Sequence, residues 1–156
     1  KIESLVKIYS GVLFKNGKHV TYHYNPGGKV SLPKNVKEGD DAMVVATGIA
    51  FDLGRNLATL KCHIHIITDP NDDIDGITVL KHQMGKNPFA AKVPLHITLH
   101  TSIGFAPRLC GELLSKIEKM EKSVRDHVYS ELWPFQYFEG KWGFLYKQDQ
   151  YVKDHV

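Results

Sequence analysis

Two short segments of the chain share one pattern of residue types: histidine, a β-branched residue, threonine, a bulky apolar residue and histidine. They are residues 19–23 and residues 96–100, about half of the 156-residue chain apart. Side chains alternate between the two faces of a strand, so His19 and Thr21 share one face, as do His96 and Thr98. Within each pair the two residues lie about 7 Å apart, close enough to hold one tetrahedral phosphate, whereas the second histidine lies about 13 Å from the first and should miss it.

These residue types suit acid–base chemistry on a phosphate ester. Histidine has an unperturbed pKa of about 6.5, so a pair of imidazoles can act as base and acid in one reaction near neutral pH. Threonine hydroxyls can donate hydrogen bonds to phosphate oxygens as negative charge builds there. We therefore predict a shared catalytic site made of His19, Thr21, His96 and Thr98, which needs no metal and no other cofactor.

The double His-x-Thr pattern, with one copy in each half of the chain, resembles the 2H phosphoesterase superfamily. The segment from Pro94 to Leu99 is especially similar to the second motif of that family. The resemblance implies an α+β fold that is two-lobed and pseudo-two-fold, with mostly antiparallel sheets, one His-x-Thr strand in each lobe and at least one long helix packed on the sheet. We expect residues 1–156 to form one such domain.

The resemblance also implies a substrate. It would be a 2′,3′-cyclic phosphate at an RNA end, a small cyclic nucleotide or a related 2′,5′-phosphodiester, which points to RNA repair or tRNA splicing. One of His19 and His96 would activate water while the other protonates the leaving ribose oxygen. Domains of the eukaryotic tRNA-ligase type leave a 2′-phosphate and the bacterial type can differ, so the sequence leaves the product open.

Aromatic side chains near the motifs could stack on a base. Tyr24 and Phe105, at strand or loop ends, are the predicted substrate-binding residues. Alternation turns Tyr22 toward the core, and Tyr9 lies inside a predicted strand, so both are read as packing residues. Lys18 and Arg108 flank the motifs and could contact phosphate, but a charged residue beside a turn is usually solvated, and we expect this of both.

Composition limits the class of protein. A net charge of +3 permits an anionic partner such as an RNA end but is far from the charge density of a duplex-coating protein. The two cysteines, Cys62 and Cys110, form no Cys-x-x-Cys pair, and no apolar run is long enough to cross a bilayer. We expect no membrane partner and a reducing compartment, cytoplasmic or nuclear. Because the chain begins at Lys1 rather than Met, we expect either a monomer or a domain of a larger RNA-processing protein.

β-type patterns dominate the first two-thirds of the chain, and no amphipathic helix is evident between residues 15 and 92. One long helix is expected from Pro107, with an apolar stripe continuing to Val128 and a stop at Pro134. The predicted strands are residues 5–14, 19–24, 42–51, 58–68 and 142–146, with hairpin turns at 15–18 and 52–56 and loops at 69–73 and over most of 85–93.

Two alternative functions belong to other classes of protein, and the first is a metal hydrolase or metal-binding module with histidine ligands. His63 and His65 share a strand face and could chelate zinc, with His82 completing a three-histidine set. No acidic residue has a recognisable ligand spacing, and the same alternation suits an ordinary sheet with a polar face. The other alternative is a catalytically silent RNA-binding domain, in which the His-x-Thr pairs would be dispensable.

Overall fold

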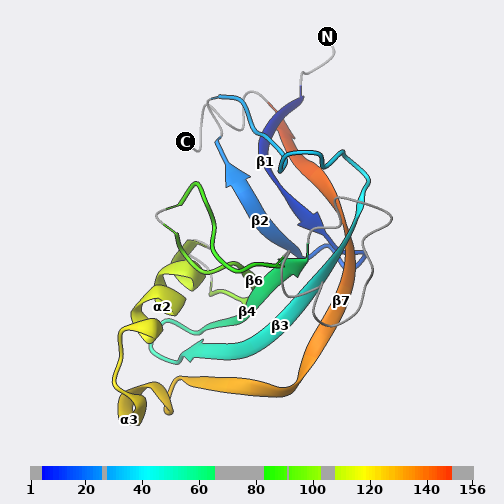
Figure 1. Cartoon of the computed structure of the whole chain (residues 1–156). Coiled ribbons are helices and arrows are strands. Elements are labelled where there is room, and N and C mark those ends of the chain that lie inside the picture. Colours follow the sequence, from blue (N-terminus) through cyan, green and yellow to red (C-terminus); the bar gives the residue numbers. More distant parts are fainter. Residues whose placement is uncertain (1–4, 26–27, 66–82, 91, 103–107, 149–156) are drawn as a thin grey trace.

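The protein is a closed β-barrel of six antiparallel strands. The computed structural model describes residues 5–25, 28–65, 83–90, 92–102 and 108–148. The barrel order is β3-β7-β1-β2-β6-β4, and pairing between β3 and β4 closes it, while β5 adds to the end of β4 (Figure 1). The strands are β1 (Leu5–Leu13), β2 (His19–Tyr24), β3 (Asp41–Asp52), β4 (Leu57–His65), β5 (Gln83–Met84), β6 (His96–His100) and β7 (Tyr129–Gln148), and the described helices are α2 (Arg108–Glu118) and α3 (Lys122–Arg125).

The expected α+β fold with two facing lobes is therefore wrong. The two His-x-Thr strands do not lie in separate lobes; β2 and β6 are neighbours in one barrel, paired at Val20 and Ile97. Both of these residues point into the barrel core, at 0% and 4% exposure. A repeated motif on two adjacent antiparallel strands can build a shared site without any duplication of a half-domain.

The predicted hairpins are confirmed. Strand β2 begins and ends where its alternating pattern does, and β1 reaches it through a turn in which Gly17 has a φ of +86°, a conformation that glycine adopts without strain. The pair β3 and β4 forms the second hairpin around residues 52–56. The predicted strand ends at 66–68, and the loop at 69–73, lie outside the described residues.

The barrel interior is filled by one face of each strand. Its buried residues come mainly from β1, β2, β3, β4 and β6, with Trp142 from β7, while Tyr22 packs edge-on against Trp142 with 5.7 Å between ring centroids. Tyr22 is thus a core residue, as alternation predicts. Because this face is apolar, the polar residues between the core positions project from the outside of the barrel.

The expected long helix is wrong as well. Helix α2 ends at Glu118 and the short α3 follows, with Val124 about half exposed rather than on a continuous buried stripe. The chain then enters β7, where Tyr129 pairs with Ala50 of β3. Pairing with β3 is a long-range contact, and tertiary contacts of this kind override local helix propensity.

Pro134 does not mark the end of a helix but lies inside β7. The ladder with β3 shifts between Gly48, opposite Glu131, and Ala46, opposite Gln136. The extra β7 residues leave the ladder at this point, which is where a strand can accept a proline that donates no hydrogen bond. Strand β7 consequently runs far beyond the predicted final strand at 142–146.

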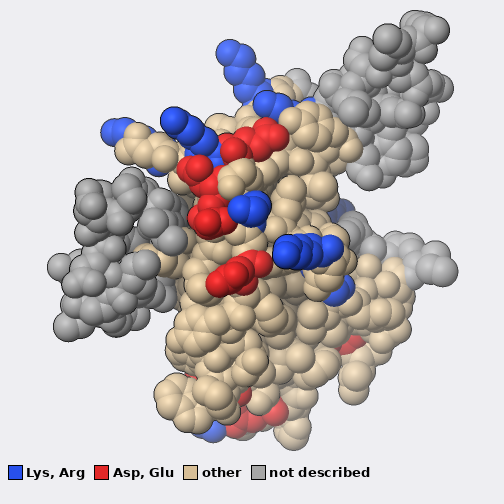
Figure 2. Space-filling model, turned by 90° about the vertical axis from the view of Figure 1, so that its right-hand side faces the viewer, with Lys and Arg blue, Asp and Glu red and all other residues tan. Residues whose placement is uncertain are grey.

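Helix α2 lies along the outside of the barrel next to β6, and its apolar side packs on β3 and β4 (Figure 1). On the face turned to the viewer in Figure 2, basic and acidic side chains intermix in the upper half and leave much of the lower half uncharged. The described part of that face carries no single-sign stripe of the kind that follows a duplex. None of the helices within the described ranges is long and apolar enough to cross a membrane.

Candidate active site

The two His-x-Thr pairs project side by side from the outside of the barrel. Val20 lies opposite Ile97 in the antiparallel ladder, so continuation of that register sets His19 against Thr98 and Thr21 against His96. Each histidine therefore has a threonine of the other strand as its cross-strand neighbour. The alternation predicted from the sequence brings all four side chains to one face.

A cavity of about 600 Å³ opens on this face. His19, Thr21, His96 and Thr98 all line it. Its size is within the range of small-molecule sites and far exceeds what a single phosphate fills. The other lining residues that matter below are Tyr9, Tyr24, Asn87, Phe89, Arg108 and Gly111.

His96 has a fixed ring orientation. Its Nδ1 lies 3.0 Å from the carbonyl oxygen of Pro94. Because a carbonyl can only accept, Nδ1 must carry the proton, and Nε2 is the ring nitrogen left for a bound molecule. A neutral His96 can thus accept a proton at Nε2, and a charged one can donate it.

The surroundings disfavour the charged form of both imidazoles. Burial, the neighbouring His96 and the Lys18 ammonium lower the pKa of His19 below 6.5. Burial also lowers the pKa of His96, against the opposing effect of the hydrogen bond to Pro94. Two coupled titrating groups that face one cavity are a common feature of acid–base sites.

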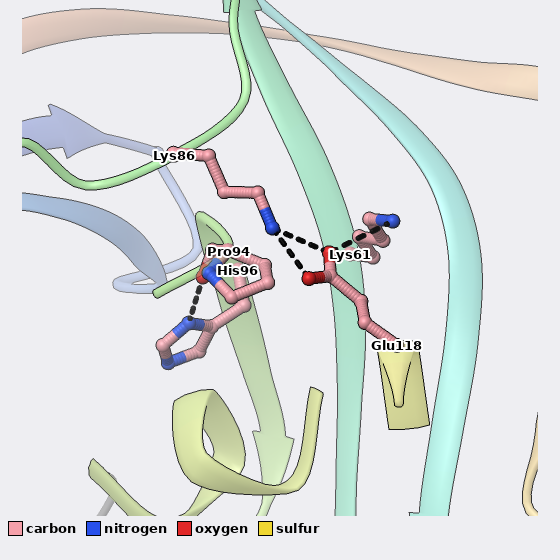
Figure 3. Close-up of polar contacts among 5 residues, drawn as sticks. All are labelled: Lys61, Lys86, Pro94, His96 and Glu118. Carbon is pink, nitrogen blue, oxygen red and sulfur yellow. Dashed lines mark hydrogen bonds and ion pairs between the residues drawn. The ribbon is translucent and has the colours of Figure 1, made fainter. Parts of the chain in front are cut away.

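An ion-pair cluster holds helix α2 behind His96 (Figure 3). The carboxylate of Glu118 accepts hydrogen bonds from the Lys86 ammonium at 2.5 and 2.6 Å, and it lies 3.5 Å from the Lys61 ammonium. Lys61 is the β4 residue paired with His96, and Lys86 forms a bridge with Pro94. The cluster is partly exposed and contributes at most about 1 kcal/mol, but it links the end of α2 to the strand partner of His96 and to the bridge partner of Pro94.

Two residues expected to be only solvated have defined places. The Lys18 ammonium donates to the carbonyl oxygens of Thr98 and Leu99 at 3.4 and 3.3 Å, joining the start of β2 to β6. Arg108, at the start of α2, lines the cavity. The expectation that these cations lie free in solvent is wrong for Lys18.

The aromatic residues that line the cavity are only partly the ones predicted from the sequence. Tyr24 lines the cavity and is 60% exposed, whereas Phe105 lies outside the described residues. Tyr9, read as a packing residue, also lines the cavity, with its ring centroid 5.0 Å from that of His19. Its position follows from the β1–β2 register, which pairs Tyr9 with Tyr24.

No sequence pattern marked the segment that forms one wall of the cavity. Asn87 and Phe89 lie in the predicted loop at 85–93, where neither a period of two nor a helical period marks a face. Their proximity to the second motif along the chain was the only available indication. The local contacts that hold them in place involve β2, which is distant in sequence.

The described residues do not support the alternative of a histidine-bound metal site. His63 packs against Gly85, and His65 is buried at the end of β4. Across the described ranges, no group of three or more histidine, cysteine, aspartate or glutamate side chains is arranged to hold a metal ion. His82 lies outside those ranges.

Comparison with known proteins gives no match: no family model fits the sequence, and no curated protein or solved structure is detectably similar.

Proposed function

We propose that this chain is a metal-independent phosphodiesterase of the 2H type, which hydrolyses 2′,3′-cyclic phosphates at RNA ends or in small cyclic nucleotides. The observation that carries the proposal is the pairing of β2 with β6, which sets two His-Thr neighbours on one cavity face. It acts alone or as a domain of a larger RNA-processing protein, in a reducing compartment. His19, Thr21, His96 and Thr98 are its catalytic residues.

In the proposed reaction the threonine hydroxyls and a charged imidazole hold the phosphate oxygens. A neutral imidazole takes a proton from water as the water oxygen attacks phosphorus in line. The opposite P–O bond of the cyclic ester breaks, and the second imidazole protonates the leaving ribose oxygen. The product is a ribose monophosphate, with the proton taken from water balanced by the one given to the leaving oxygen.

The direct test is incubation of the purified chain with an oligonucleotide that ends in a 2′,3′-cyclic phosphate. We expect ring opening to a single phosphomonoester, with its position assigned by phosphorus NMR. Turnover should survive exhaustive chelation because two histidines and two threonines supply acid, base and oxyanion contacts, and His63→Ala should remain close to the parent rate. Loss of turnover in chelator that zinc restores would contradict the proposed site and favour a metal hydrolase.

The pH dependence should follow from the lowered pKa values of the two imidazoles. One group must be neutral and one charged, so kcat/KM should be bell-shaped and report the coupled pair in the free enzyme. Burial lowers the pKa of both His19 and His96 below 6.5. The fall of kcat/KM on the high-pH side of the maximum reports loss of the acid's proton, so its midpoint should lie below pH 6.5. A maximum of kcat/KM above pH 7 would contradict this assignment.

A further inference from the structure

Phe89 occupies an unusual position on the wall of the cavity. It lines the cavity, and half of its surface is exposed. One face of its ring is stacked on the His23 imidazole, with centroids 3.9 Å apart and ring planes 12° from parallel. Tyr22 meets it nearly edge-on, at 5.2 Å and 87°. His23 therefore covers one face of the ring, Tyr22 packs at nearly a right angle to it, and half of the side chain remains exposed at the cavity wall.

The backbone and the stacking partner of Phe89 are both fixed. Its amide donates to the side-chain oxygen of Asn87 at 2.8 Å, and the Asn87 amide group donates to the carbonyl oxygen of Thr21 at 3.3 Å. Asn87 is buried, at 8% exposure. The Ser31 amide donates to Nδ1 of His23 at 3.0 Å, and this bond holds the imidazole on which Phe89 stacks.

This arrangement links an aromatic platform to the proposed catalytic strand. Asn87 bonds directly to the backbone of Thr21, so the loop that carries Phe89 is set at a fixed place relative to the first His-x-Thr pair. A preorganised ring loses little conformational freedom when a ligand binds it. By comparison, Tyr24 is more exposed, and its ring lies 6.2 Å from that of Tyr9 at a tilt of 52°.

We propose that Phe89 is the base-stacking residue of this site, an inference that rests on the proposed function. The nucleobase of a nucleoside 2′,3′-cyclic phosphate would form the third layer of the stack His23–Phe89–base while the phosphate lies at the His-x-Thr pairs. The cavity volume of about 600 Å³ leaves room for a nucleoside beyond the phosphate. Stacking accepts every base, so the site takes nucleosides in general and favours purines for their larger rings.

The test compares a substrate that has a base with one that lacks it. For Phe89→Ala we expect kcat/KM on adenosine 2′,3′-cyclic phosphate to fall by about 10- to 100-fold, mostly through KM, because stacking lies away from the reacting bond. On methyl riboside 2′,3′-cyclic phosphate, which has no base, the same variant should match the parent within about twofold. Phe89→Trp should restore the preference for adenosine, and Phe51→Ala, an exposed phenylalanine on β3, is the matched control.

An equal loss on both substrates would overturn the inference, as would a selective loss in Tyr24→Ala with none in Phe89→Ala. Binding of adenosine 2′-monophosphate, measured by calorimetry, gives a readout that does not need turnover. If the parent hydrolyses neither substrate but binds this nucleotide, and Phe89→Ala does not, the proposed function fails and the stacking site stands. If the parent neither hydrolyses nor binds, both fail.

Discussion

Replacement of His19 or His96 by alanine should lower kcat on a 2′,3′-cyclic phosphate by about 10²- to 10⁴-fold, the usual contribution of one acid or base group. The two losses should not add in the double variant, because both imidazoles serve the same displacement. Thr21→Ala and Thr98→Ala should cost less, since a neutral hydroxyl binds phosphate more weakly than a charged imidazole does. Single-turnover kinetics on an oligonucleotide with a cyclic end would measure all five variants.

The chain provides a matched control for the histidine substitutions. His100 ends the same five-residue segment as His96 but is exposed, and its Nε2 lies 3.0 Å from the side-chain nitrogen of Asn56. His100→Ala should therefore keep nearly full turnover. His19 and His96 lie outside the barrel core, so circular dichroism should show both alanine variants folded. Near-parental hydrolysis by both folded variants would end the proposed mechanism.

The sequence predicted local structure well where a pattern of period two was unbroken. The hairpins β1–β2 and β3–β4 follow directly from alternation and from turns rich in Gly and Asn, because these depend on neighbouring residues only. Alternation also predicted which face of β2 and β6 carries His19, Thr21, His96 and Thr98. That prediction required no knowledge of how the two strands meet.

Barrel closure could not be read in the same way. Besides the β3–β4 hairpin, the closed barrel needs pairing of β3 with β7 and of β2 with β6, between segments that are distant in the chain. Local patterning does not specify such partners, so the repeat was misread as two lobes. The expected long helix failed for a further reason: the apolar spacing that ends at Val124 and Val128 fits one helix, but Val124 lies in the short α3 and the chain pairs with β3 from Tyr129 onward.

The cavity wall shows a third limit of local reasoning. Asn87 and Phe89 have no periodic signal, and their positions depend on contacts with Thr21 and His23 on β2. Nothing in a loop sequence reveals which strand it will fold against. Residues that shape specificity can therefore be missed even where the residues expected to do the chemistry are recognised.

Gly111→Ala should separate the effect on activity from the effect on stability. Gly111 is buried in α2, and an added Cβ would lie 2.6 Å from Cγ1 of Val93 and 3.0 Å from Cε1 of His96. Alanine favours the helix by about 1 kcal/mol over glycine, while the crowding costs about 1–3 kcal/mol. These contributions oppose each other, so the free energy of unfolding should change by no more than about 2 kcal/mol, measured by urea denaturation.

For kcat, no favourable contribution of Gly111→Ala offsets the crowding. To accept the methyl group, α2 or the His96 ring must move, and a displacement of about 1 Å can cost about 100-fold in rate. We expect kcat of Gly111→Ala to fall by about 10- to 100-fold, whereas Lys116→Ala, on the exposed side of the same helix, should match the parent. Adding Val93→Ala removes the shorter contact but leaves the one with His96, so the double variant should regain stability and only part of its kcat. A stable Gly111→Ala protein with parental kcat would show that the rate does not depend on the position of His96 against α2.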